Sequence, residues 1–349
     1  MGTFYLLPEK GNFYKANLHC HTVVSDGALT PEQVKEAYQK EGYSIVAFTD
    51  HRQYCKHEEL DDDRFLSIAA FEADINQFSA HENAWPTLKV YHFNFYDKYP
   101  ERREKEENIA LPLKRYSDTE YINGYIELMK AEGFLCCYNH PYWSLQTYED
   151  YKDLRGLWAM EIYNHGCEHD GLYGFNPQSY DEMLRTGQRI YTVATDDNHN
   201  SFPFDSPLCD SFGGFTMVKA EKLEYGAVME ALEKGDFYFS MGPEIKEAYI
   251  RDRKLVVKTS PVEKIFVIQE GRNCYKKLAG RGETITEAEF ELSGREGYIR
   301  VEIRDGKGMY AGTSAYWMDE IPAGAMTESK TSLQATRYQT CNAAEQRGI

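Results

Sequence analysis

Strand-like and helix-like segments alternate from the N-terminus to about residue 240 of this chain, and this alternation restricts the fold more than any other feature. Short runs rich in β-branched and aromatic residues predict buried strands: FYKANLHCH, YSIVAFTDH, TLKVYHFNFY, FLCCYNHP, LWAMEIYN and RIYTVATDDNH. Runs with helical apolar spacing lie among them: TPEQVKEAYQKEG, TEYINGYIELMKAEG and SYDEMLRTGQ. Repeated strand–helix units predict an α/β fold whose parallel sheet is either open or closed into a barrel.

Two of these helices have recognisable ends. Thr30 is suited to cap the first helix, and Gly42 is suited to end it. Thr119 is a candidate cap for the second helix, which Gly133 would stop. A further helix is expected to end at Gly235, just before a strand.

The pattern changes after Pro243, where apolar and polar residues alternate between turn signals. We therefore expect an α/β domain over residues 1–242, a small antiparallel β domain over 243–322, and an irregular tail over 323–349. A charged segment over about 97–118 interrupts the first domain. It is either a solvated insertion or a lid whose cations reach an anionic substrate, the candidates being Arg102, Arg103, Lys114 and Arg115.

Composition bears mainly on partners and location. Asp and Glu number 56 against 39 Lys and Arg, for a net charge of −17, which disfavours long duplex DNA as a partner. No apolar run approaches the roughly 20 residues that a membrane span needs. The opening residues MGTFYLLPEKGNF lack the pattern of a signal peptide, and the eight Cys lack a disulfide-framework spacing. We therefore expect a cytoplasmic protein with reduced thiols and no membrane partner.

Histidine and acidic side chains recur where the predicted strands end. Five segments deliver histidine to one end of the predicted sheet, and three of them also carry aspartate: HCHTVVSD, TDH, VYHF, NHP and TDDNH. Any single histidine of this kind is more often an ordinary loop or core residue. The recurrence at the carboxyl ends of strands, where α/β barrels place their active sites, favours a site for Zn, Mn or Fe instead.

The first strand shows how such a site would be built. Because side chains alternate across a strand, His19 and His21 share one face while Cys20 points to the other. The same spacing would bring Asp197 and His199 to one face if their strand stays extended.

The opening stretch NLHCHTVVSDGALTPEQVKEAYQKEGYSIVAFTDH resembles that of the PHP (polymerase and histidinol phosphatase) family. The resemblance continues in order through Glu72 in AAFEADI, His92, NHP at 139–141, EIYN at 161–164 and ATDDNH at 194–199, and it covers roughly residues 13–240. It implies a distorted (β/α)7 barrel with metal ions at the strand ends. It also implies hydrolysis of phosphoesters.

The resemblance further implies which side chains bind two to three divalent ions. The family's ligands map onto three groups: His19, His21 and Asp197 for the first ion; Glu72, bridging to the second ion, with His92 and His140; and Asp26, His51 and His199 for the third. Spacing alone does not choose Glu72 over Glu82, or His92 over His81. We expect hydroxide generated by the ions to attack phosphorus, with Asp197 and His199 as candidate proton acceptors or donors.

Four other residues have candidate roles. Asp50 either orients a histidine or caps a strand end. Arg52 is either a phosphate clamp or a surface partner of Glu58 or Glu59. His165 and His169, in NHGCEHDG, are candidate substrate contacts.

Three functions remain open. The first is hydrolysis of a small phosphomonoester, a nucleotide or a short oligonucleotide end. The second is cleavage of a non-phosphate ester, amide or carbamate by the same centre. The third is a non-catalytic metal-binding domain, which the competent residue at every expected ligand position disfavours. A homo-oligomer is compatible with all three.

Overall fold

The computed structural model describes residues 2–78, 87–104, 106–108 and 115–327. They form two compact units. Within the described ranges, the α/β unit comprises residues between 10 and 242 together with 309–314, and the β unit comprises 2–9, 243–308 and 315–327. These bounds differ from the predicted domains because residues 2–9 belong with the β unit: Thr3–Tyr5 pairs antiparallel with Ile245–Arg251.

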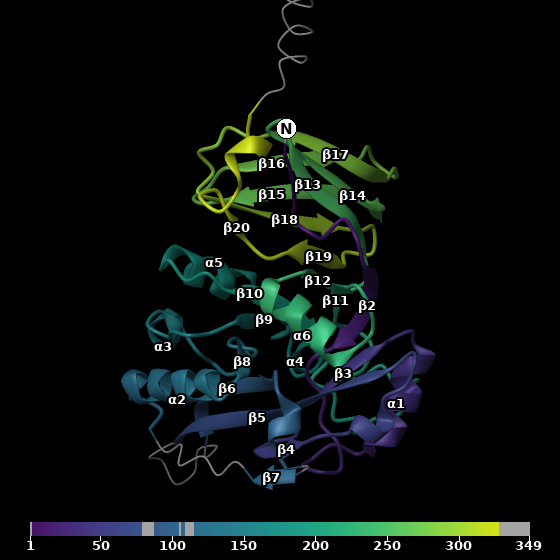
Figure 1. Cartoon of the computed structure of the whole chain (residues 1–349), viewed down its shortest axis with the longest axis vertical. Helices are drawn as coiled ribbons and strands as arrows, with labels where there is room; N and C mark the ends of the chain where they lie inside the picture. The colour runs from purple at the N-terminus through teal and green to yellow at the C-terminus, as the bar shows by residue number, and fades with distance from the viewer. Residues whose placement is uncertain (1, 79–86, 105, 109–114, 328–349) are drawn as a thin grey trace, which may run out of the picture. The chain divides into compact units, whose positions relative to one another are not determined.

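The α/β unit contains the strands and helices that lie between residues 10 and 242, together with one strand from later in the chain, at residues 310–313 (Figure 1). Its strands are β2 (Asn12–Asn17), β3 (Ile45–Phe48), β4 (Gln53–Cys55), β5 (Leu66–Phe78), β6 (Thr87–Asp97), β7 (Glu106–Asn108), β8 (Phe134–Tyr138), β9 (Ala159–Asn164), β10 (Tyr191–Thr195), β11 (Phe215–Ala220), β12 (Phe237–Ser240) and β19 (Tyr310–Thr313). Its helices are α1 (Pro31–Lys40), α2 (Thr119–Ala131), α3 (Tyr148–Tyr151), α4 (His165–His169), α5 (Pro177–Arg185) and α6 (Tyr225–Lys234), with 3-10 turns η1 (Glu58–Leu60) and η2 (Pro100–Arg102).

The main sheet of this unit is mixed rather than parallel, which corrects the prediction. Strands β2, β3 and β5 run parallel, as do β8, β9 and β10, but β6 is antiparallel to both β5 and β8. The connection between β5 and β6 is too short to join parallel strands. Strand β5 ends at Phe78 and β6 begins at Thr87, whereas a parallel crossover needs about a dozen residues or more.

The segment after β2 contacts the segment after β10, at the other end of this run of strands. Cys20 and Asn198 form an isolated parallel bridge. The Asp197 amide donates to the His19 carbonyl (2.9 Å), and the His21 amide donates to the Asn198 carbonyl (3.0 Å). These bonds bring β2 and β10 together around one set of histidines. Closure into a (β/α)7 barrel stays a prediction.

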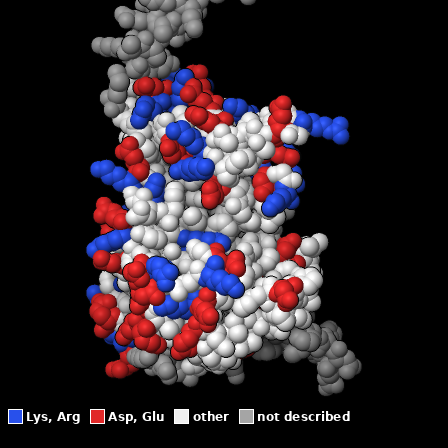
Figure 2. All heavy atoms as spheres, turned by 90° about the vertical axis from the view of Figure 1, so that its right-hand side faces the viewer, with Lys and Arg blue, Asp and Glu red and all other residues white. Residues whose placement is uncertain are grey.

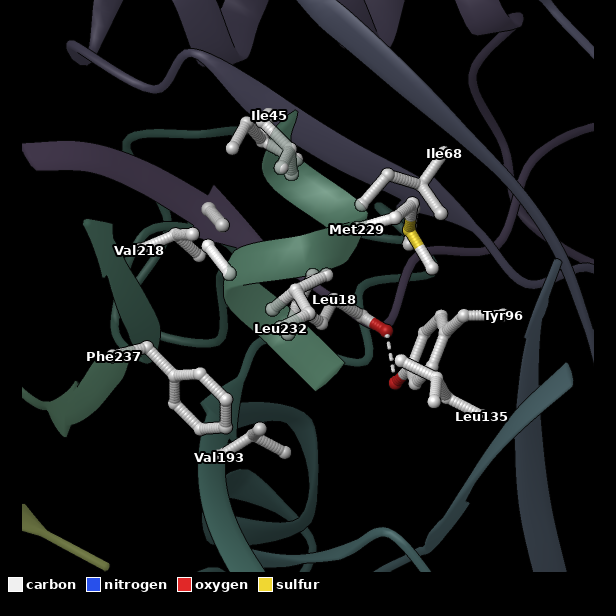
Figure 3. Close-up of a cluster of buried hydrophobic side chains, with 14 of the residues drawn as sticks. Leu18, Ile45, Ile68, Tyr96, Leu135, Val193, Val218, Met229, Leu232 and Phe237 are labelled. Atoms are coloured by element: carbon white, nitrogen blue, oxygen red, sulfur yellow. Dashed lines mark hydrogen bonds between the residues drawn. The ribbon is translucent and has the colours of Figure 1, made fainter. Parts of the chain in front are cut away.

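A hydrophobic cluster packs between the sheet and α6 (Figure 3). Met229 and Leu232 of α6 meet apolar side chains from several strands, including Ile68, Val193 and Phe237. The Tyr96 hydroxyl donates to the Leu18 carbonyl (2.8 Å), the hydrogen bond drawn in Figure 3. This core therefore fixes the backbone immediately before His19.

Helix ends follow local capping rules, with one correction. Thr30 caps α1 through a reciprocal pair of hydrogen bonds with Gln33, as predicted. Asp118, not Thr119, caps α2, because its carboxylate accepts the Tyr121 amide (3.0 Å). Helix α6 ends at Gly235, whose φ of 79° is the left-handed conformation that glycine adopts most readily.

The β unit is built from antiparallel strands, as the alternating pattern predicts. One sheet has the order β1 (Thr3–Tyr5), β13 (Ile245–Arg251), β14 (Lys254–Val262) and β17 (Ile285–Glu291). A second run pairs β16 (Cys274–Leu278), β15 (Lys264–Gln269), β18 (Tyr298–Arg304) and β20 (Tyr316–Trp317). The short turn η3 (Ala323–Ala325) is the last described element, and most of the predicted tail lies outside the described residues.

The charged segment at 97–118 is described only in part. Arg103 binds the Asp97 carboxylate (3.0 Å) and lies over the Phe134 ring, and Arg102 lies over the Tyr99 ring. Lys114 lies outside the described residues, so the lid hypothesis stays a prediction. Over the face drawn in Figure 2, Asp and Glu side chains lie among the Lys and Arg.

The described helices are short compared with a bilayer. Helix α2 has 13 residues, whereas a span needs about 20 apolar ones. None of the helices in the described ranges is long and apolar enough to cross a membrane.

Candidate metal centre

His19 and His21 lie just beyond the end of β2, in the middle of a buried polar cluster. Both side chains are fully buried, and their Nε2 atoms are 3.1 Å apart. Cys20, between them, joins a hydrophobic cluster with Val34 and Phe48 on the opposite side. The period-two alternation of an extended chain therefore delivers both imidazoles to one face, as the sequence predicts.

Glu161 of β9 orients His19, a role that sequence reasoning missed. The His19 Nδ1 and a Glu161 carboxylate oxygen are 2.7 Å apart, and both side chains are buried. An imidazole that donates from Nδ1 presents Nε2 as a ligand atom. Glu161 also accepts hydrogen bonds from the Thr195 hydroxyl (2.7 Å) and the His140 amide (3.1 Å). The one signal in the sequence was a carboxylate inside the otherwise apolar strand AMEIYN.

A tight loop after β2 brings Asp26 back toward the same histidines. Asp26 Oδ1 lies 3.5 Å from His21 Nδ1, and its Oδ2 lies 3.6 Å from His51 Nε2. Gly27 permits this approach, because a Cβ there would lie 2.4 Å from the His21 carbonyl oxygen. The loop can therefore close because Gly27, the residue after Asp26, has no side chain.

Asp50 shapes this loop rather than a histidine, which differs from both predicted roles. Its carboxylate accepts hydrogen bonds from the amides and hydroxyls of Thr22 and Ser25, at 2.8 to 3.1 Å. Four donors on one buried carboxylate hold the turn that carries Asp26. The effect of Asp50 on the candidate centre passes through that turn.

Glu72, in the middle of β5, lies closest to the centre of the cluster. One carboxylate oxygen lies 3.0 Å from His92 Nδ1 and 3.3 Å from His19 Nε2, and the other lies 3.0 Å from His51 Nδ1. The Asn139 amide group donates to this carboxylate at 2.8 Å. Burial alone would raise the pKa of Glu72, but the neighbouring charges, chiefly His92 and His19, bring that pKa well below its usual value.

Backbone pairing explains why Glu72 and His51 meet. The Glu72 amide donates to the Asp50 carbonyl (3.3 Å), and the Arg52 amide donates to the Glu72 carbonyl (2.7 Å). These two bonds form an isolated parallel bridge between His51 and Glu72. His92 reaches the same carboxylate from the interior of β6, the strand in which the sequence places it, and this strand runs antiparallel to β5.

His140 and Asp197 complete the cluster from strained backbone positions. His140 has a φ of 26° and Asp197 a φ of 53°, both in the region that favours glycine. Strand β10 ends at Thr195, so the extended conformation considered for Asp197 and His199 is not observed. Asp197 instead turns its carboxylate to 3.0 Å from His19 Nε2 and 3.1 Å from His21 Nε2.

His199 lies at the open side of the cluster, with its side chain 32% exposed. Its Nε2 is 3.6 Å from Asp26 Oδ1, and its ring stacks on His21 with centroids 4.2 Å apart. Burial opposes protonation of His199, but the hydrogen bond with Asp26 and the charge of Asp197 raise its pKa to about 9. For His51, burial is the main cause that lowers the pKa to about 4.

The residues predicted as ligands therefore lie together, and we call them the ligand cluster: His19, His21, Asp26, His51, Glu72, His92, His140, Asp197 and His199. Ligand-type atoms within it fall into overlapping groups that could each hold an ion, such as His21, Asp26, His51 and His199. Buried atoms that make no hydrogen bond of acceptable geometry include His21 Nδ1, His51 Nδ1 and Asp197 Oδ1. His51 Nδ1 and Asp197 Oδ1 nevertheless lie within 3.0 Å of Glu72 and His19, respectively. Ligand-type atoms that are this close without forming hydrogen bonds fit a shared metal ion between them. Glu82 and His81, the alternatives to Glu72 and His92, lie outside the described residues.

The three residues predicted to contact the substrate do not all lie at the cavity. Arg52 turns away to Asp74 (3.0 Å) rather than to Glu58 or Glu59, and its side chain is 59% exposed. His165 lies beneath Gly213, bonded to the Tyr163 hydroxyl (2.9 Å). Among the predicted contacts, only His169 lines the cavity beside the cluster.

That cavity has a volume of about 550 Å³ and opens beside the ligand cluster. Beyond cluster residues, its wall is formed by Trp143, Gly166, Cys167, His169, Asp170, Ser201, Phe202, Leu208 and Asp210. No Lys or Arg is among the described residues that line it. An anion bound here would therefore depend on metal ions or protonated imidazoles for countercharge.

Comparisons with known proteins give short or distant matches. A stretch of 42 residues is 48% identical to the DNA polymerase/3'-5' exonuclease PolX of Bacillus subtilis (strain 168). That stretch is 12% of this chain and only 7% of PolX. No family profile matches the chain.

Two solved structures match the chain at low similarity. One is a two-domain protein from Bacteroides vulgatus that contains a predicted PHP-like metal-dependent phosphoesterase. It is 14% identical, covers 90% of this chain and 98% of its own, and has a TM-score of 0.43. The sequence motifs, and not this structure, carry the resemblance of the chain to the PHP family. The other, a candidate metal-dependent phosphoesterase from Bifidobacterium adolescentis, is 15% identical, covers 58% of this chain and 91% of its own, and has a TM-score of 0.35.

Proposed function

We propose that this PHP-like chain is a metal-dependent hydrolase of small phosphomonoesters or short oligonucleotide ends. The observation that carries the proposal is the ligand cluster, in which buried imidazoles and carboxylates converge beside a cavity. Mixed nitrogen and oxygen ligands of this kind suit Zn, Mn or Fe. Two to three such ions, held by the three predicted groups of ligands, would lower the pKa of bound water and offset charge on a phosphoryl group.

The protein's own part in this reaction is largely to hold its ligand atoms in place. Glu161 keeps the His19 Nε2 directed into the cluster, and Asn139 fixes the Glu72 carboxylate. Asp50 holds the loop of Asp26. These neighbouring groups direct the His19 and Glu72 ligand atoms into the cluster and hold the turn that carries Asp26.

Proton transfer is assigned to the exposed edge of the cluster. Asp197 and His199 are the proposed proton acceptors or donors, and of the two His199 is the more exposed, at 32% against 12%. A group at the mouth of the cavity can exchange its proton with water. The buried His19 and His21 cannot do so without a change of structure.

The size of the substrate is limited by charge and by the cavity. A volume of about 550 Å³ suits a small molecule or one end of a short chain. The net charge of −17 opposes binding of long duplex DNA. The absence of Lys and Arg from the described lining keeps a second candidate open, the hydrolysis of an uncharged ester, amide or carbamate.

Phosphate release from a panel of phosphomonoesters tests the proposal, with metal-stripped protein given Mn²⁺, Zn²⁺ or Fe²⁺ in turn. We expect release with at least one ion and none without. The matched pair of variants is His19→Ala, inside the cluster, and His57→Ala, whose ring packs on Phe48 outside it. Release that persists in His19→Ala would contradict the proposal, and esterase activity without phosphatase activity would favour the second candidate.

A further inference from the structure

The cavity wall beside the ligand cluster is aromatic and apolar on one part and acidic on another. Trp143 lies next to two candidate ligands, with its ring centroid 5.0 Å from that of His140 and 6.0 Å from that of His92. Phe202 and Leu208 line the same cavity, and each side chain is 47% exposed. Large apolar side chains that are half exposed inside a cavity leave apolar surface for a ligand to cover.

Trp143 is fixed in place rather than loosely exposed. Its indole N–H donates to Asp170 Oδ2 at 2.8 Å, so one edge of the ring is tied to the residue that follows α4. The edge-to-face contact with His140, at an interplanar angle of 80°, orients the ring further. A ring held on two sides makes a stacking surface that costs little ordering when a ligand binds.

The loop that carries Phe202 and Leu208 is also anchored to the cluster. The Asp210 carboxylate accepts the His199 amide (2.7 Å) and the Asn200 amide (3.0 Å). These bonds join the far end of the loop to the ligand-bearing segment. The apolar wall and the candidate ligands are therefore parts of one ordered arrangement.

The charged side chains on the cavity wall limit which chemical groups of a substrate can bind there. Asp170 and Asp210 lie on the wall outside the ligand cluster, whereas no Lys or Arg is found among the described lining residues. A second phosphate or carboxylate on the substrate would meet these carboxylates, with His169 as the imidazole on this part of the wall and no Lys or Arg among the described lining residues. A flat, uncharged ring would cover Trp143 and the apolar side chains instead.

We infer that the cavity contains a subsite for a flat, uncharged aromatic ring, with Trp143 as its stacking surface. Resting on the proposed function, this assigns as substrates phosphomonoesters whose alcohol part carries such a ring and no second anionic group. Trp143 is then a specificity-determining residue. In this arrangement the ligand cluster binds the phosphoryl group, and Trp143 stacks on the ring of the alcohol part.

Non-hydrolysable phosphonates test the subsite by binding alone. Calorimetry on the metal-loaded protein compares benzylphosphonate with butylphosphonate and with 4-carboxybenzylphosphonate. We expect benzylphosphonate to bind about fivefold more tightly than butylphosphonate, and the carboxylated ring to lose that advantage. Trp143→Leu should reduce the preference for the ring below about twofold while leaving the affinity for butylphosphonate nearly unchanged.

Tyr142→Leu is the matched control, because Tyr142 is 52% exposed but packs on Tyr173 rather than lining the cavity. It should keep the preference for the ring. Trp143→Phe should keep most of it, since the ring remains and only the bond to Asp170 is lost. Equal binding of benzyl and butyl phosphonates, or a preference that survives Trp143→Leu, would overturn the subsite.

The ring alone is tested with benzyl alcohol and butanol by saturation-transfer NMR. We expect transfer to benzyl alcohol that Trp143→Leu removes. This result supports the subsite even if no phosphonate binds and no phosphate is released, an outcome that would contradict the proposed function alone. Absence of transfer to benzyl alcohol in the unmodified protein would contradict the subsite alone.

Discussion

The two units of this chain arrange their buried charged side chains differently. In the β unit, the strands turn residues such as Leu255, Val257 and Ile265 inward. Charged side chains there form ordinary ion pairs, both half exposed, as Lys254 with Glu289 at 2.6 Å, and buried, as Arg300 with Glu302 at 2.6 Å. In the α/β unit, by contrast, Glu72 and Glu161 are buried beside imidazoles.

This contrast distinguishes charged side chains with little effect on the fold from those that serve a function. An exposed ion pair is free to form or break at little cost, whereas a buried carboxylate without a partner is expensive. A chain that keeps several buried carboxylates and imidazoles together in one unit must hold each of them with a paired group or a bound ion, because each is costly to bury alone. The buried cluster, rather than the number of charges, is what marks the α/β unit as the one that carries chemistry.

The largest expected effect comes from removing a carboxylate at the strained end of β10. Asp197→Ala should reduce turnover by at least about 1,000-fold, because its carboxylate lies 3.0 to 3.1 Å from two candidate ligands. Steady-state phosphate release at saturating metal measures this. Circular dichroism should show the fold retained, and near-normal activity would refute a ligand role for Asp197.

Metal removal should affect the two units unequally. An ion present at about 100 times its dissociation constant stabilises a fold by about 2.7 kcal/mol, and chelation removes that term from the unit that binds it. Hydrogen exchange followed by mass spectrometry, with and without chelator, resolves the units. We expect faster exchange around residues 17–26 and 195–200, with β13 to β18 unchanged. Equal changes in both units would break the comparison.

Glu161→Gln tests whether a buried neighbour tunes a ligand. Glutamine keeps the size of the side chain but loses the charge that faces His19 Nδ1 at 2.7 Å. We expect metal affinity to fall by about 10- to 100-fold, with activity recovered at higher metal concentration. A metal titration of activity and of direct binding measures the shift. Lost activity that excess metal does not restore would argue that Glu161 does more than position His19.

The smallest effect is expected in the β unit. Lys254→Ala removes an exposed partner of Glu289 and should change the free energy of unfolding by less than about 1 kcal/mol, with activity unchanged. Urea denaturation and phosphate release check both statements. A loss comparable with that of Asp197→Ala would mean that exposed and buried charges do not differ as we propose.

Local sequence rules predicted those parts that depend on near neighbours. Alternation placed His19 and His21 on one face, and Thr30 was predicted to cap α1, as it does. Spacing could not rank Glu72 against Glu82, a choice that came from the resemblance to a family. The direction of β6 was missed, because the repeated strand–helix pattern was taken to imply parallel strands and β5, the strand before β6, was not predicted.

What the sequence could not show depends on distant partners. Glu161 meets His19 across 142 residues, and Asp50 meets Ser25 through a turn that no periodicity describes. Arg52 follows a candidate ligand directly, yet a φ of 57° directs its side chain to Asp74. Such contacts arise from tertiary pairing and backbone strain, which leave no regular pattern along the chain.

The sheet of the α/β unit is completed by strand β19, which lies outside the main segment of that unit, residues 10–242. Residues 310–313 pair with β12, and the Ser314 hydroxyl accepts the Thr192 amide at 3.0 Å, although some 65 residues of the β unit come between. The β unit is equally discontinuous, because β1 must wait for β13. During synthesis on a ribosome, the edge of the α/β sheet therefore stays unpaired until residue 314 has emerged. Truncation at residue 242 would leave β12 as an open edge, prone to pairing with other chains.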